Sequence, residues 1–294
     1  MKRQPIDTLV YFDTNIYNHL LDNQNQIEPI KKAVSNRIVG IFVSDVNFEE
    51  LLGTYRNNPQ KAQSLFQLAW NICLHRATQP LFNLVKAEFR HLIDLSVRIN
   101  VYSNDKNYAN NFIDWWNLLA KQPNVKKDEI ESTLQNIKEN KYDFRDAMKL
   151  GQQKMKEVIT KDNIKFQTPE EFLKEMLNKS SSVRDYINGF LSKVNNPQIT
   201  VDMVRSNLSK MEGFRHSLYY YLLALVYHHN FAGGEPELGD SRDMHHIIYA
   251  GYSDIFVSDD TNLVKYLRYI PTKKHKYLKL DEFIQYLKTL EKTI

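Results

Sequence analysis

The strand-like segments of this chain lie near its two ends, and a long region of helical pattern separates them. Short β-branched and aromatic runs occupy residues 8–12 and 38–43, and later residues 255–258 and 277–280. From about residue 60 to residue 232, apolar residues recur at spacings of three and four, which is the period of amphipathic helices. Each early strand is followed by a helical pattern, and this alternation predicts a parallel sheet covered by helices.

The same distribution predicts how the chain is organised. We expect one α/β domain formed by residues 1–58 and 235–294, whose two parts meet in space, with an all-helical insertion at residues 59–234. The chain has only 9 glycines and 9 prolines in 294 residues, which argues against long flexible linkers and favours helix.

Acidic residues stand where the predicted strands end. Asp13 and Asp260 each follow a strand-like run. Glu50 lies about two turns into the helix after the second run, and Asp243 opens the helix before the third. Ligand sites of parallel α/β sheets collect at the carboxyl ends of the strands, so neighbouring strands would bring these four carboxylates into one crevice. Asp240, one turn before Asp243, would either cap that helix or join the same set.

Converging carboxylates need a positive charge between them, because each raises the pKa of its neighbours. Mg²⁺ or Mn²⁺ would supply it, since both prefer carboxylate oxygens, and no set of histidines or cysteines accompanies the acids as a zinc site would require. Such a cation could activate water and stabilise a phosphodiester during attack. The neutral side chains expected to orient ligands or contact phosphate are Thr14, Asn15 and Ser258.

Four segments, in this order along the chain, resemble the PIN-domain family of nucleases. Tyr11-Phe-Asp-Thr-Asn15 resembles the opening strand and first acid, and Val43-Ser44 followed by Glu50-Leu51-Leu52 resembles the second acid. Asp243-Met-His-His-Ile-Ile-Tyr-Ala250 is similar to the third-acid helix, and Phe256-Val-Ser-Asp-Asp260 to the hydroxyl-x-Asp strand end.

This resemblance implies a PIN-like parallel sheet between layers of helices, and a Mg²⁺- or Mn²⁺-dependent endoribonuclease. Asp13, Glu50, Asp243 and Asp260 would then be its catalytic, metal-binding acids, and RNA rather than DNA its expected substrate. The helical middle has no counterpart in the minimal family domain, and the chain looks closer to larger PIN-like proteins with helical insertions.

The family register also selects between adjacent residues. It favours Glu50 over Glu49, which we expect on a solvated face, and Asp260 over Asp259. Adjacent side chains on a helix point about 100° apart. A paired metal site of His245 and His246 is therefore not expected. One of them could reach substrate phosphate, but surface or packing roles are favoured.

Basic residues follow the last predicted acid. Residues 261–280 hold six basic residues and no acidic one, so this stretch is either a strip that contacts phosphate or a solvated loop. Lys265 and Arg268 are its members closest to the predicted site, and Arg242 beside Asp243 is a further candidate phosphate contact. Aromatic clusters could stack on bases, but packing is expected for Trp115-Trp116 and Tyr219-Tyr220-Tyr221.

Composition narrows the other possibilities. The net charge of +4 does not by itself demand a polyanionic partner. No run of about 18 apolar residues occurs, and no signal-peptide pattern opens the chain, so we expect a cytoplasmic protein without membrane contact. The single cysteine, Cys73, is expected to be a buried structural thiol.

Two other functions remain open at this point. The first is a catalytically inert PIN-like module that binds nucleic acid or a protein. The second is a phosphotransferase or phosphatase of the haloacid-dehalogenase type. That chemistry needs a second aspartate two residues after the first, and Asn15 at this position argues against it. The helical insertion could recognise substrate, form a homodimer or bind a regulatory partner.

Overall fold

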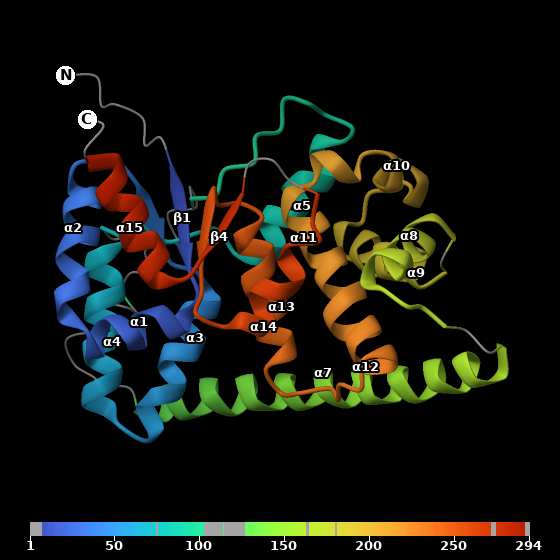
Figure 1. Cartoon of the computed structure of the whole chain (residues 1–294), viewed down its shortest axis with the longest axis horizontal. Coiled ribbons are helices and arrows are strands. Elements are labelled where there is room, and N and C mark those ends of the chain that lie inside the picture. Colours follow the sequence, from blue (N-terminus) through green and yellow to red (C-terminus); the bar gives the residue numbers. More distant parts are fainter. Residues whose placement is uncertain are drawn as a thin grey trace.

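The computed structural model describes residues 8–74, 76–102, 114, 127–162, 165–179, 181–271 and 275–291. Four parallel strands form one sheet in the order β2-β1-β3-β4. The strands from the two ends of the chain thus lie side by side (Figure 1). The predicted α/β class is confirmed, and the strands are β1 (Leu9–Phe12), β2 (Gly40–Phe42), β3 (Ile255–Val257) and β4 (Lys276–Leu278).

Both faces of β1, β2 and β3 are buried, which explains why these strands are continuous apolar runs in the sequence, whereas the edge strand β4 is partly exposed. In β1, Val10 and Phe12 belong to one core, whereas Tyr11 belongs to the other. Tyr11 is in register with Phe42 of β2 and Phe256 of β3, and it stacks on both at ring-centroid distances of 5.1 and 5.9 Å. An aromatic row therefore crosses the second face of the sheet.

Helices cover each face. The core on the Phe12 side includes residues of α1 (Thr14–Asp22), α2 (Ile27–Ser35), α4 (Pro59–Ile72) and α15 (Leu280–Glu291). The core on the Tyr11 side includes residues of α5 (Leu81–His91), α11 (Glu212–Tyr220), α13 (Asp240–Ala250) and α14 (Thr261–Leu267). Helix α3 (Asp45–Gly53) contributes to both cores.

The middle of the chain is mostly helical in its described part. Two isolated β-bridges also occur there, Val43 with Ala77 and Thr78 with Tyr102. A π-helix, η4 (Tyr221–Tyr227), continues α11. The remaining helices are α7 (Lys127–Asp162), α8 (Pro169–Lys179), α9 (Ser181–Val194), α10 (Val201–Ser206) and α12 (His228–Phe231), with 3-10 turns η1 (Gln24–Gln26), η2 (Thr54–Arg56) and η3 (Leu208–Lys210).

The described middle helices pack into the same two cores as the sheet. Leu65 and Phe66 of α4 share a core with β1, and Phe214 and Leu218 of α11 share the other core with Tyr11. Packing thus joins residues 59–234 directly to both faces of the sheet. The division into a PIN-like domain and an insertion stays a prediction.

Helix α7 is the longest element. Its 36 residues span about 54 Å at a rise of 1.5 Å per residue. It runs along one side of the molecule, contacts α3, α13 and α12, and extends beyond them (Figure 1). None of the helices in the described part of the chain is both long and apolar enough to cross a membrane.

The direction in which successive strands are added to the sheet reverses at β1. The chain passes from β1 to β2 on one side, and then returns across β1 to β3 and β4 on the other. Ligand crevices of open parallel sheets form at such a reversal, outside the carboxyl ends of the strands. Asp13 follows β1 and Asp260 follows β3, so both stand at this point.

Candidate metal centre

Asp13 directly follows β1 and is 7% exposed. Its backbone N–H donates to the carbonyl oxygen of Val257 at 2.9 Å, which ties it to the end of β3. The Ser258 hydroxyl donates to Asp13 Oδ2 at 2.6 Å and accepts from the Asp260 N–H at 3.1 Å. The Asp13 side chain does not cap α1, so its carboxylate faces the site.

Glu50 reaches the same place from α3. The start of this helix is fixed by a capping box, in which Ser44 Oγ accepts from the Asn47 N–H at 3.2 Å and Asn47 Oδ1 accepts from the Ser44 N–H at 3.0 Å. Glu50 lies on the turn that follows, facing α13. The structure brings Glu50 rather than Glu49 to Asp13, in agreement with the predicted register.

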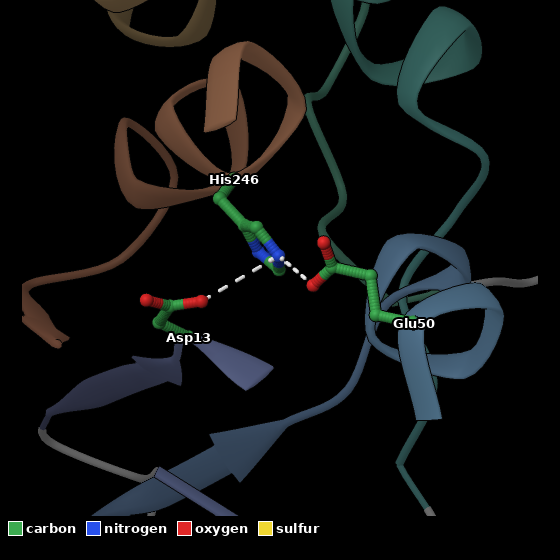
Figure 2. Close-up of side chains that lie close together, drawn as sticks. All are labelled: Asp13, Glu50 and His246. Atoms are coloured by element: carbon green, nitrogen blue, oxygen red, sulfur yellow. Dashed lines mark hydrogen bonds and ion pairs between the residues drawn. The ribbon is translucent and has the colours of Figure 1, made fainter. Parts of the chain in front are cut away.

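His246 of α13 lies between these two carboxylates (Figure 2). Its Nε2 is 2.8 Å from Glu50 Oε2 and 3.6 Å from Asp13 Oδ1. One ligand atom from each of Asp13, Glu50 and His246 lies within 4.8 Å of the others. The structure excludes a surface role for His246, because the side chain is 1% exposed, and it places the buried imidazole in direct contact with the acids.

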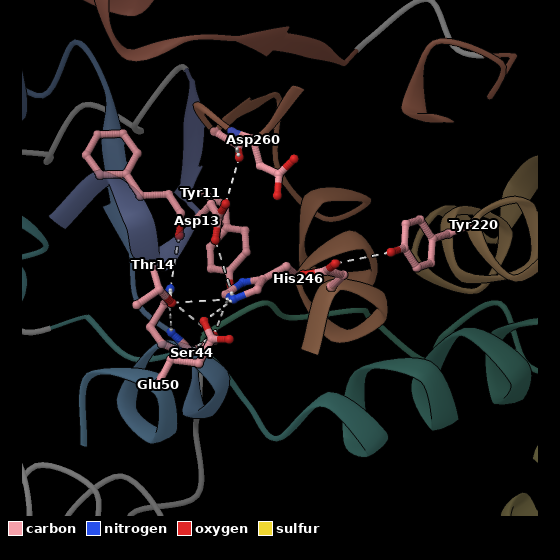
Figure 3. A network of polar contacts seen from close by, with 12 residues as sticks. Tyr11, Asp13, Thr14, Ser44, Glu50, Tyr220, His246 and Asp260 are labelled. Carbon is pink, nitrogen blue, oxygen red and sulfur yellow. Dashed lines mark hydrogen bonds and ion pairs between the residues drawn. The ribbon is translucent and has the colours of Figure 1, made fainter. Parts of the chain in front are cut away.

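A chain of hydrogen bonds fixes which nitrogen of His246 faces the acids (Figure 3). The Ser44 hydroxyl donates to Asn47 Oδ1 at 3.2 Å, so Ser44 Oγ must accept from the Tyr11 hydroxyl at 2.7 Å. Tyr11 Oη then accepts from His246 Nδ1–H, also at 2.7 Å. Nε2 is therefore the nitrogen left for a proton or a metal ion.

The pKa values of Asp13, Glu50 and His246 are shifted because the side chains are buried close together. Burial, only partly offset by His246 and Ser258, raises the pKa of Asp13. Burial would also hinder the charged forms of Glu50 and His246, but their mutual attraction is stronger: it lowers the pKa of Glu50 and raises that of His246. Without a metal ion, an imidazolium thus compensates the two carboxylates.

Asp243 and Asp260 stand next to this group. Burial, together with the negative charges of Asp13, Asp260 and Glu50, raises the pKa of Asp243 to about 7 although His246 opposes the shift. The Tyr220 hydroxyl, at the end of α11, donates to Asp243 Oδ2 at 3.4 Å. Asp243 and Asp260 also line one cavity of about 140 Å³.

Neighbouring acids have other partners. Asp240 accepts from the Glu237 N–H at 2.8 Å and lies 3.6 Å from His229 Nε2, outside the Asp13 group but in the same cavity as Asp243. Asp259 accepts from the Leu280 N–H at 3.0 Å. It thus ties β3 to α15, whereas Asp260 faces the cavity.

The neutral and basic residues predicted for the site differ in how close they lie to the acids. Thr14 Oγ1 accepts from Asn47 Nδ2 at 3.0 Å and lies 3.4 Å from His246 Nε2. Asn15 Oδ1 has no hydrogen-bond partner among the described residues. Arg242 is buried and pairs with Glu49, so Glu49 is not on a solvated face as expected.

Lys265 and Arg268 line a cavity of about 360 Å³ together with Ser258 and Asp260. The tyrosines Tyr219 and Tyr220 are buried, as expected for packing. Trp115, Trp116, Lys273 and Lys274 lie outside the described residues.

His246 is the residue that the sequence reasoning missed, and a signal for it existed. Asp243 and His246 are three residues apart, so they share one face of a helix. Tyr11 and Asn47 gave no such signal, because a buried tyrosine and a helix-start asparagine are common in any fold.

No protein-family model, curated protein or solved structure matches this chain.

Proposed function

We propose that this protein is a metal-dependent nuclease that hydrolyses phosphodiester bonds, with Asp13, Glu50, Asp243 and Asp260 as its acidic residues. One observation carries the proposal: ligand atoms of Asp13, Glu50 and His246 lie within 4.8 Å of one another at the carboxyl edge of the sheet. The family resemblance of the four acidic segments makes RNA the expected substrate and endonucleolytic cleavage the expected reaction.

The donor set fits a divalent cation. Carboxylates suit both Mg²⁺ and Mn²⁺. Of these two ions, Mn²⁺ accepts an imidazole nitrogen more readily, because Mg²⁺ is a hard cation that prefers oxygen ligands, so His246 favours Mn²⁺. Asp243 and Asp260 could supply further oxygens. Asp240 would lie outside this set, because its carboxylate is occupied by Glu237 and His229.

The cation would supply a water-derived nucleophile and neutralise charge on the phosphodiester. Side chains of this chain already orient the atoms that would bind the cation. The Ser258 hydroxyl donates to Asp13 Oδ2, and the Tyr11 hydroxyl accepts from His246 Nδ1–H. Asp13 Oδ1 and His246 Nε2 are therefore the atoms that face the site. Thr14 is within reach of the same atoms, and Asn15 follows it on α1.

The fold assignment that goes with this function is a PIN-like α/β domain of residues 1–58 and 235–294 with a helical insertion at residues 59–234. The strand order with Asp13 at its reversal supports it. A homodimer or regulatory partner would bind through the insertion, and nucleic-acid contacts would include Lys265 and Arg268. The ion pair of Arg242 with Glu49 makes Arg242 the weakest of the three predicted contacts.

One observation favours a second candidate, an inert PIN-like binding module. The raised pKa of His246 favours an imidazolium between Glu50 and Asp13, which offsets part of their negative charge without a metal ion. Metal affinity distinguishes the two functions: the nuclease binds Mn²⁺ through this site, and the inert module does not.

The test is cleavage of labelled single-stranded RNA and DNA by the full chain with Mn²⁺, Mg²⁺ or EDTA. We expect Mn²⁺-dependent cleavage of RNA that falls about a hundredfold or more in Asp13→Asn and Asp260→Asn, because each variant removes a negatively charged oxygen from the site. Asp259→Asn is the matched control and should keep its activity, since Asp259 binds the backbone of Leu280 instead.

Cleavage that survives in both site variants would contradict the assignment. Absence of cleavage together with absence of Mn²⁺ binding, measured by calorimetry, would leave the inert module as the function.

A further inference from the structure

We propose that the cavity beside Asp260 binds a second backbone phosphate, so that the substrate is a polynucleotide and not a mononucleotide or a single diester. This inference rests on the proposed function and adds to it a subsite and the direction in which the substrate leaves the metal centre.

The cavity has a volume of about 360 Å³ and lies along α14. Thr261 and Lys265 are at positions i and i+4 of this helix. Arg268 is the C-cap residue at i+7 and keeps a helical conformation, so all three share the exposed face. The opposite face of α14 is buried in the core. Lys279, which follows β4, and Tyr277 of β4 complete the wall. The arrangement thus presents three cationic side chains from two elements to one hollow.

These cations are available for a ligand. Lys265, Arg268 and Lys279 are all exposed, and no ion pair within the described residues includes any of them.

The two carboxylates that line the same cavity already have backbone partners. Asp260 Oδ1 accepts from the N–H groups of Asn262 and Leu263 at 2.8 and 3.1 Å, and Glu282 accepts from the Lys279 N–H at 2.8 Å. A phosphate would therefore meet more positive than negative charge.

The other cavity at this edge has the opposite character. Its lining includes four carboxylates besides Asp260, namely Glu235, Glu237, Asp240 and Asp243. The two cavities share Asp260, Asn262 and Lys265, so α14 separates an acidic hollow from a basic one. The metal centre itself is on the acidic side, since Asp243 lines that cavity, so a phosphate backbone that leaves the cation would be attracted toward the basic cavity.

The basic cavity is close enough to act on the same substrate. Ser258 lines it and also donates to Asp13, and Ser258 N–H donates to Leu278 O of β4 at 3.0 Å. Neighbouring strands lie about 4.8 Å apart, so the ends of β1 and β4 are roughly 10 Å apart. At about 3.4 Å per nucleotide of a stacked strand, two to three nucleotides would bridge the metal centre and the cavity.

The test measures binding without cleavage. A labelled single-stranded RNA oligonucleotide, the same sequence in DNA, and a dinucleotide are titrated with the full chain in EDTA over a series of salt concentrations. For Lys265→Gln/Arg268→Gln we expect about tenfold weaker binding of the oligonucleotide at low salt. The salt dependence should be less steep by about 0.7, which is the contribution of the one phosphate that the variant no longer neutralises. The dinucleotide should bind weakly to both proteins.

Lys86→Gln/Arg90→Gln is the matched control. These residues line a separate cavity of about 340 Å³ that contains none of the predicted site residues, so this variant removes equal charge elsewhere and should bind like wild type. Thermal unfolding of both variants checks that the substitutions leave the fold intact.

Equal losses in the two variants would overturn the proposal, because the effect would then follow net charge alone. Wild-type binding of the dinucleotide as tightly as the oligonucleotide would overturn it as well. The binding measurement does not require cleavage, so it tests the subsite even if the protein is catalytically inert. Failure of the nuclease proposal and failure of the subsite proposal are therefore distinguishable.

Discussion

Tyr11 is fully buried in the middle of the sheet, yet its hydroxyl group contacts two other buried polar side chains. It accepts from His246 Nδ1 and donates to Ser44 Oγ, both at 2.7 Å. The ring belongs to the hydrophobic core, and the hydroxyl belongs to the candidate metal centre. One side chain therefore couples the rigidity of the sheet to the orientation of His246.

Replacing Tyr11 by phenylalanine removes this hydroxyl and keeps the ring. Two buried polar groups then lose a partner, so the free energy of unfolding should fall by about 1 to 3 kcal/mol. Loss of a group that orients a metal ligand typically weakens metal affinity by about 10- to 100-fold. Denaturant unfolding and Mn²⁺ titration measure the two effects.

Tyr17→Phe is the control. Tyr17 is equally buried, but its hydroxyl has no hydrogen-bond partner among the described residues. Its removal should leave stability unchanged or raise it, and should not alter Mn²⁺ affinity. If both variants behave alike, the hydroxyl of Tyr11 does not hold His246.

The acidic residues of the site could be predicted because a strand end fixes their position. Asp13 and Asp260 follow apolar runs, and parallel pairing brings such ends together whatever the rest of the fold does. His246 could not be placed in this way. The helical spacing from Asp243 gives its face, but only tertiary packing shows that this face meets Glu50.

At the scale of elements, α11 crosses the end of α13 at two glycines. A Cβ atom on Gly251 would lie 2.6 Å from the carbonyl oxygen of Glu212, and one on Gly213 would meet the ring of Tyr252. The close approach lets α11 support α13, which carries both Asp243 and His246.

Gly251→Ala should therefore destabilise the protein. The obstructing atoms are backbone atoms of α11, which cannot turn away as a side chain could, so we expect a loss of about 1 to 3 kcal/mol in the free energy of unfolding. Gly189→Ala in α9 is the control. A Cβ atom there meets nothing within 4 Å, and alanine should stabilise the helix by up to about 1 kcal/mol. Denaturant unfolding curves compare them, and a neutral Gly251→Ala would mean that the helices are not in close contact.

Glu88 of α5 holds the start of α11. It is 2% exposed, and its two carboxylate oxygens accept from the N–H groups of Gly213 and Phe214 at 2.8 and 2.9 Å. Burial outweighs these hydrogen bonds and raises the pKa of Glu88 from 4.5 to about 7. The folded state thus binds this proton more tightly than the unfolded state does.

This difference makes stability depend on pH. The contribution of Glu88 is largest below its unfolded pKa of 4.5 and is lost as pH rises through about 7. Glu88→Gln removes the titration. Between about pH 5 and about pH 7.5, wild type should lose about 2 kcal/mol more stability than the variant. Unfolding of both proteins at the two pH values gives this double difference, and a difference near zero would contradict the raised pKa.

The strands could be predicted because a strand that is buried on both faces is a continuous apolar run in the sequence. Helix α7 was harder to foresee. It is polar on most of its surface, so its sequence carries little helical periodicity, and contacts with α3, α12 and α13 hold it in place. The π-helix at Tyr221–Tyr227 could not be foreseen, because its apolar sequence is equally suited to an ordinary helix.

At the scale of the whole molecule, the sheet joins the two ends of the chain. β1 lies between β2, which follows it closely in sequence, and β3, which comes after almost the entire helical middle. The contact between Asp13 and Ser258 spans 245 residues. Contacts so distant in sequence are slow to form, because a long loop must close before they are made.

This connectivity sets when the site can exist during synthesis. A ribosome makes Asp13 and Glu50 early, but His246 and Asp260 only after the helical middle has emerged. Until then β1 has no partner on its β3 side, and the two early carboxylates have no counterion from α13. A nascent or prematurely terminated chain would therefore lack the grouped acids until residues 243–260 have been made, so the centre assembles only after the helical middle has been translated.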